Sequence, residues 1–170
     1  LTNANVTTKD QLFATLDPTM RAIKLPGGHQ AVLSDTVGFI SNLPHELVNA
    51  FRATLEEVSE ANIIVHVRDI AHPDSESHKN DVLGVLRTLG INETAEGDMI
   101  EALNKIDLLD EKQRAILTNR NQRKHKPAII MSAKTGDGCD TLLRALASQI
   151  TSDFETHKIQ IDSTDGQKLA

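Results

Sequence analysis

Aromatic residues are nearly absent from this sequence of 170 residues, which has four Phe and neither Trp nor Tyr. Proteins that bind single-stranded nucleic acid usually stack bases on aromatic side chains, so we expect no such platform. The single Cys excludes an internal disulfide and a cysteine-rich metal site, and it fits a reducing compartment. The net charge of −6 gives no overall attraction to phosphate backbones, and we expect no sequence-specific DNA binding.

Long apolar runs are also missing. No run approaches the length of about 18 residues that a membrane helix needs, so we expect no membrane span. The first residues, Leu1 to Val6, have neither a basic start nor an apolar stretch and include no initiator Met, unlike a signal peptide. We therefore expect a chain that begins inside a longer protein. We expect that protein to be cytoplasmic, with peripheral membrane association left open.

Short apolar runs alternate with amphipathic segments, over a length that suits roughly one domain. The expected strands are residues 22–25, 31–35, 62–67, 99–103 and 127–131, and the expected helices are 47–58, 74–89, 111–123 and 140–150. This order predicts an α/β fold, a mostly parallel sheet with helices on both faces. Ligands bind beyond the carboxyl ends of the strands in such sheets. The segments at those ends are residues 35–39, 69–72, 104–107 and 132–134.

The first of these segments is Asp35-Thr36-Val37-Gly38. A carboxylate at a strand end can hold Mg²⁺ directly or through water. A glycine three residues later lets its backbone N–H approach a terminal phosphate, because no Cβ stands in the way. Taken alone, this pattern is more often an ordinary turn.

Asn104-Lys105-Ile106-Asp107 follows the expected strand 99–103. The carboxylate of Asp107 can accept two hydrogen bonds from the N1–H and the exocyclic amine of guanine, a pair of donors that adenine lacks. The aliphatic stem of Lys105 can cover the base, and Asn104 can hold the loop. The alternative is that Asp107 caps a solvated helix.

Ser132-Ala133-Lys134 follows the next expected strand. The backbone N–H of Ala133 could contact the guanine O6, and Lys134 could cover the other face of the base. The alternative is a cap and turn in which Gly136 is the turn residue.

The three motifs stand at three strand ends in the order phosphate, base, base, and they resemble the G3, G4 and G5 motifs of translation-factor-related P-loop GTPases. Residues 12–19, 35–40, 43–45 and 50–57 together resemble the HflX family within the Obg–HflX group, and the resemblance covers nearly the whole chain. It implies GTP or GDP as ligand, Mg²⁺ as cofactor and slow GTP hydrolysis. It also implies the ribosome as partner, chiefly its large subunit, in ribosome splitting or rescue under stress.

The resemblance also implies the site residues. Thr15 and Asp35 would hold Mg²⁺, with Thr19 as a weaker substitute for Thr15, and Gly38 would sense the γ-phosphate. Phe39 stands where many GTPases have the Gln that orients the attacking water, so no residue is assigned as catalytic and hydrolysis should be slow. The implied nucleotide-binding set is Phe13, Ala14, Thr15, Leu16, Asp17, Asp35, Thr36, Val37, Gly38, Asn104, Lys105, Ile106, Asp107, Ser132, Ala133 and Lys134.

One element of the GTPase pattern is missing. The sequence G-x-x-x-x-G-K followed by Ser or Thr, which cradles phosphates, does not occur in the 170 residues. By family analogy the P-loop and the first, central strand precede Leu1. Residues 1–153 would then be a partial G domain that binds GTP poorly by itself, and residues 154–170 would begin a C-terminal segment or extra strand. The alternative function is a nucleotide-free interaction module with the same fold.

Two remaining features have ordinary interpretations. His66, His72 and His78 lack the spacing of a metal-ligand set, and we interpret them as ordinary histidines. The basic run from Arg120 to Lys126 suits a solvated helix C-terminus, which the helix dipole favours, with an rRNA phosphate contact as the alternative.

Overall fold

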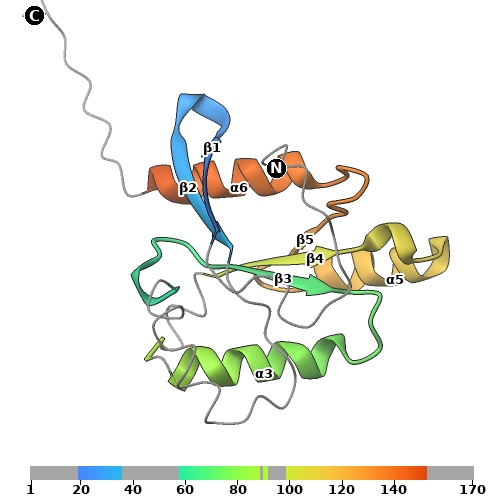
Figure 1. Cartoon of the computed structure of the whole chain (residues 1–170). Coiled ribbons are helices and arrows are strands. Elements are labelled where there is room, and N and C mark those ends of the chain that lie inside the picture. The colour runs from blue at the N-terminus through green and yellow to red at the C-terminus, as the bar shows by residue number, and fades with distance from the viewer. Residues whose placement is uncertain (1–18, 36–57, 89, 92–98, 153–170) are drawn as a thin grey trace, which may run out of the picture.

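The computed structural model describes residues 19–35, 58–88, 90–91 and 99–152, and the elements labelled in Figure 1 lie in these ranges. Most of the expected helix 47–58 lies outside them, although residues 58–60 are helical. The expected C-terminal segment 154–170 also lies outside the described residues. Within the described part of the chain, no helix combines the length and the apolar character that crossing a membrane requires.

An antiparallel hairpin opens the described chain. β1 (Thr19–Lys24) pairs with β2 (Gln30–Asp35), and Thr19 lies opposite Asp35 in the register. A 3₁₀ turn, η1 (Pro26–Gly28), joins the two strands. Gly27 and Gly28 have φ values of 84° and 83°, so this turn needs residues without a Cβ. The sequence predicted both strands but not that they pair antiparallel.

The remaining strands form a parallel sheet in the order β3–β4–β5, and helices follow each strand. β3 (Val65–Asp69), β4 (Ile100–Asn104) and β5 (Ile129–Ile130) are the strands, and α3 (Ser75–Thr88), α5 (Glu111–Gln122) and α6 (Cys139–Ser152) are the helices. A parallel sheet with helical connections confirms the predicted α/β fold. β5 has only two residues, because only Ala102 and Leu103 of β4 pair with it.

The helices cover both faces of the sheet, as predicted. In Figure 1, α6 and the hairpin lie on one side of β3–β5 and α3 lies on the other. The larger apolar cluster joins Ile23 of β1, Ile100 and Ala102 of β4, and Leu142 and Leu146 of α6. A smaller cluster on the α3 side contains Leu86, Ile91 and Met99. Each cluster packs a helix against the sheet, α6 through the larger cluster and α3 through the smaller one.

Candidate functional site

The carboxyl ends of β3 and β4 meet at one edge, where Asp69 and Asn104 are register partners. Immediately after β4, Lys105 adopts the left-handed conformation with φ 69°, the one positive φ of a non-glycine residue in the described ranges. That conformation costs an L-residue about 1–2 kcal/mol. A 3₁₀ turn, η2 (Ile106–Leu108), follows, and its N–H at Ile106 donates to the carbonyl of Met131 at 3.3 Å. The strained turn therefore directs the loop after β4 toward the loop after β5.

Three side-chain contacts link these two loops. The backbone N–H of Ala133 donates to Asn104 Oδ1 at 2.9 Å, and the Ser132 hydroxyl donates to Asp107 Oδ1 at 2.6 Å. Lys134 Nζ lies 4.0 Å from Asp107 Oδ2. The hydrogen bond from Ser132 is the main cause of a pKa of Asp107 below its ordinary value, so this carboxylate is ionised at neutral pH. The structure thus brings together seven predicted residues from the two loops, namely Asn104, Lys105, Ile106, Asp107, Ser132, Ala133 and Lys134.

The two alternative interpretations of these loops have different outcomes. Asp107 is not a helix cap, because it lies inside η2, and Asp110 caps α5 in its place by accepting from the Gln113 N–H at 2.7 Å. Ser132 does form a turn, since its carbonyl accepts from the Gly136 N–H at 2.9 Å. The Ala133 N–H, predicted to contact guanine O6, already donates to Asn104 and would have to exchange that bond.

Asp69 is a site residue to which the sequence assigned no role. Its Oδ2 lies 2.8 Å from Lys105 Nζ, and its Oδ1 accepts from the Ala71 N–H at 3.0 Å. Burial by itself would raise the pKa of Asp69, but the hydrogen bond and charge of Lys105 outweigh it and the pKa is lowered. The sequence did offer a sign of this role, because Asp69 is an acid that follows an apolar strand, as the Asn104 motif follows the next one. Asp69 restrains the lysine that was predicted to cover the base.

Gly138 fixes the path of the chain after the second loop. A Cβ at this position would lie 2.2 Å from the Ile130 carbonyl oxygen and 2.9 Å from Met131 Cα, and φ is +74°. We expect Gly138→Ala to lower the free energy of unfolding by more than about 3 kcal/mol, measured by denaturant titration. Gly136→Ala is the matched control, because φ is +86° and nothing lies within 4 Å. Gly136→Ala should lower the free energy of unfolding by only about 1–2 kcal/mol. Equal losses in the two variants would mean that the close contacts of Gly138 do not matter.

The phosphate end of the predicted site is only partly described. Asp35 ends β2 and is exposed, so its carboxylate oxygens are open to a cation. Phe13, Ala14, Thr15, Leu16, Asp17, Thr36, Val37, Gly38 and Phe39 lie outside the described residues. Asp35 offers the hard oxygen donors that Mg²⁺ prefers and therefore fits the predicted ion.

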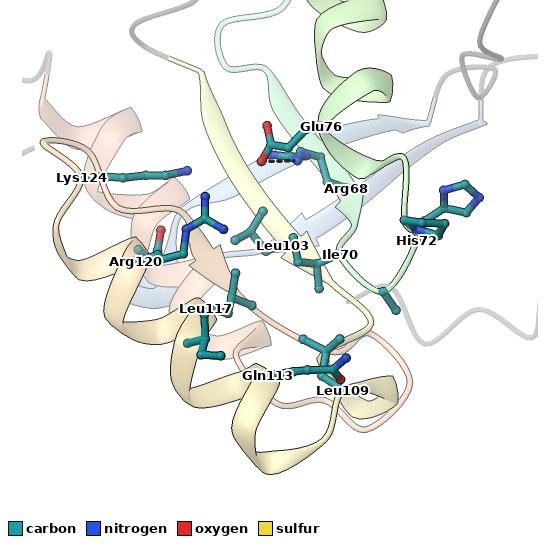
Figure 2. Close-up of a pocket in the computed structure, with 14 residues that line it drawn as sticks. Arg68, Ile70, His72, Glu76, Leu103, Leu109, Gln113, Leu117, Arg120 and Lys124 are labelled. Carbon is teal, nitrogen blue, oxygen red and sulfur yellow. Dashed lines mark ion pairs between the residues drawn. The ribbon is translucent and has the colours of Figure 1, made fainter.

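A separate cavity of about 350 Å³ lies between the β3–α3 loop and α5. Figure 2 shows Leu103 and Ile70 on the sheet side of the cavity, Leu117 on α5, and Arg120 and Lys124 at one end. Its lining includes none of the seven residues that link the two loops, so it is not the predicted base site.

A charged network borders this cavity. The Arg68 side chain is 3% exposed and donates to Glu101, which is 14% exposed. Glu76 lies 3.0 Å from Arg68, and Lys79 and Lys124 lie 3.1 Å and 3.7 Å from Glu101. Lys124, part of the predicted basic run, is therefore partly neutralised within the protein. The network links β3, β4 and α3 with Lys124, the second residue after α5.

Comparison with known proteins identifies the family of the chain. The family model of 50S ribosome-binding GTPases matches residues 1–134. GTPase HflX of Magnetococcus marinus is 44% identical over 170 residues, which is 100% of this chain and 38% of that protein. GTPase HflX of Escherichia coli K12 is 36% identical over 98% of this chain and 38% of its own length. A chloroplastic GTP-binding protein of Arabidopsis thaliana is 50% identical over 63% of this chain and 17% of its own length.

The chain therefore spans less than half the length of these curated relatives. The family match covers both loops of the linked strand ends, because residues 104–107 and 132–134 lie within the matched region. The chain belongs to the 50S ribosome-binding GTPase family, as a G domain of the HflX type.

Proposed function

We propose that this chain forms the guanine-recognition part of a GTPase, with Asp107 as the residue that selects the base. The observation that supports this proposal most directly is the bond between Ser132 and Asp107, which joins two loops separated by 25 positions in sequence. It holds one carboxylate oxygen and orients the group at the junction of the loops. An oriented, ionised carboxylate is an acceptor only, which matches the two donors on the guanine edge.

The lysines beside this carboxylate suit a flat ligand. The side chains of Lys105 and Lys134 are 52% and 79% exposed, and they come from the two different loops. Their methylene stems can cover the two faces of a base while their ammonium groups stay in water. Before the base binds, the bond from the Ala133 N–H to Asn104 ties the second loop to the first and keeps both lysines close to Asp107.

Phosphate binding completes the proposal. Asp35 and Thr15 would hold Mg²⁺, and Gly38 would contact the terminal phosphate through its backbone. When bound, Mg²⁺ neutralises charge on the β- and γ-phosphates. Phe39 cannot orient water, so we propose slow hydrolysis. The proposed partner is the large ribosomal subunit, since the matching family is described as binding it.

Titration with fluorescent GDP and Mg²⁺ tests nucleotide binding. The ligand is added to the 170-residue chain and to a longer parent protein that contains a P-loop, with fluorescent ADP as the control. We expect the parent to bind GDP much more tightly than ADP, and the chain alone to bind GDP weakly. Absence of GDP binding by both would contradict the proposal and favour the nucleotide-free interaction module.

A further inference from the structure

Two histidines and one aspartate that the nucleotide proposal does not use gather at the start of α3. Donor atoms of His72, Asp74 and His78 all lie within 4.8 Å of one another. The two imidazole rings have centroids 4.7 Å apart and planes tilted by 37°. His66 is separate from this cluster, because it is buried on β3. From the sequence we interpreted all three histidines as ordinary and did not consider Asp74 beside them.

The local fold explains why these residues meet. Asp74 precedes the first residue of α3, and its carbonyl accepts the His78 N–H at 2.9 Å, so positions 74 and 78 lie one turn apart on the same face. His72 is returned to the helix start by a tight turn, in which its carbonyl accepts the Ser75 N–H at 3.2 Å. Its Nδ1 also accepts the Asp74 N–H at 3.1 Å. In Figure 2 the His72 ring extends away from the apolar wall of the cavity.

Two imidazoles and a carboxylate form a ligand set that favours zinc-like metals over Mg²⁺. In a tetrahedral site the donor atoms stand roughly 3.3 Å apart, as follows from metal–nitrogen bonds of about 2.0–2.1 Å. His72 and Asp74 are exposed and His78 is half-buried, so rotation of these side chains can close the remaining gap without repacking a core. A water molecule can take the fourth position.

Two effects oppose metal binding, and both are small. At Nδ1 of His72 the metal takes the lone pair that the Asp74 N–H now uses, but that hydrogen bond is exposed and water can replace it. The positive end of the α3 dipole repels a cation by about 0.3–1 kcal/mol at an exposed site. The Asp74 carboxylate, which would be a direct ligand, counters this repulsion.

We propose that His72, Asp74 and His78 bind one Zn²⁺-like divalent ion per chain, at a site independent of the nucleotide. Mg²⁺ does not compete for it, because Mg²⁺ prefers oxygen donors. The site lies between Asp69, which holds Lys105, and the body of α3. Occupancy would fasten residues 72–74 to the helix.

The test uses Co²⁺ as a visible probe, followed by displacement with Zn²⁺, in buffer containing excess Mg²⁺. Four-coordinate Co²⁺ absorbs visible light far more strongly than the hydrated ion. We expect saturable binding of one Co²⁺ per chain, and Zn²⁺ should remove the absorption. We expect His72→Ala and His78→Ala each to weaken binding by about tenfold or more. Circular dichroism checks that each variant folds.

Asp74→Asn separates a ligand role from a structural one, because Asn caps a helix start as well as Asp but lacks the carboxylate. It should keep the helix and lose metal affinity. His125→Ala and Cys139→Ser, which change residues outside the cluster, should bind normally. Absence of Co²⁺ binding would overturn the proposal, and so would a stoichiometry of one ion per two chains. Unchanged binding in the His72→Ala/His78→Ala double variant would also overturn it.

Discussion

Asp107→Asn, made in a parent protein that binds nucleotide, is expected to lower GTP affinity by about 10²- to 10⁴-fold. The asparagine amide can accept one hydrogen bond from the guanine edge but not two, and it brings a donor against the exocyclic amine. Each charge-assisted hydrogen bond that is lost weakens binding by about tenfold or more. Xanthine carries a carbonyl where guanine has the amine, so the variant should bind xanthosine triphosphate better than GTP. Competition titrations against fluorescent GDP and its xanthine analogue measure the change.

Asp110→Asn is the matched control for this prediction. Asp110 lies three positions later and caps α5 through the Gln113 N–H, and Asn is an equally good cap. The control should keep both its stability and its preference for guanine. If Asp107→Asn also kept its preference for GTP, the assignment of Asp107 as the base-selecting residue would be wrong, whatever the protein does with phosphate.

The two linked loops, residues 104–107 and 132–134, were predictable because each motif is local and directly follows a strand. Asn104 ends β4 in the structure, and Ser132 comes two residues after β5. The rule that parallel strands end at one edge then places Asp107 beside Ser132, and the hydrogen bond between them confirms that placement. The sequence could not show which hydrogen bonds form between the two loops at this edge of the sheet. Whether the Ala133 N–H faces a ligand or Asn104 depends on atomic positions that no spacing encodes.

Pairings between distant segments were harder to predict. Periodicity indicated strands at residues 22–25 and 31–35 but not their antiparallel register, because hydrophobic patterns are similar for either direction. The expected strand 62–67 runs over Val65–Asp69 instead, because its register partners on β4 end at Asn104. This shift places Arg68 inside the strand, opposite Leu103. A buried arginine beside an apolar run was therefore not foreseen.

Arg68 and Glu101 form the most buried part of the charged network. The Arg68 Nε has no hydrogen-bond partner among the described residues, so the guanidinium already depends on its remaining contacts. Glu101 supplies the strongest of them, because Glu76, the other acid within reach, is 77% exposed and screened by water. Burial by itself would raise the pKa of Glu101, but the hydrogen bonds from Arg68 and Lys79 outweigh it, and the pKa is lowered.

Glu101→Leu should lower the free energy of unfolding by about 3 kcal/mol, because it leaves a buried cation uncompensated. The double variant Arg68→Met/Glu101→Leu should recover most of the loss, since well-packed apolar residues often replace a buried ion pair at no net cost. Denaturant titrations of the wild type and the variants measure both effects. Lys79→Met is the control, because its partly exposed ion pair contributes at most about 1 kcal/mol. A double variant no more stable than Glu101→Leu would show that shape at this position, not charge compensation, controls stability.

The lowered pKa of Glu101 also predicts how stability depends on pH, and the Glu101→Leu variant tests this dependence. Glu101 has a lower pKa in the folded protein than in the unfolded chain, so the folded state binds this proton less readily. Its stabilising contribution is therefore complete above the ordinary value of 4.5 and is lost as the pH falls through the lower folded value. Glu101→Leu lacks this titration, so the stability difference between wild type and variant should shrink below about pH 4.5 and stay constant above it. A difference that did not change down to pH 3 would mean that Glu101 acts through its packing and not through its charge.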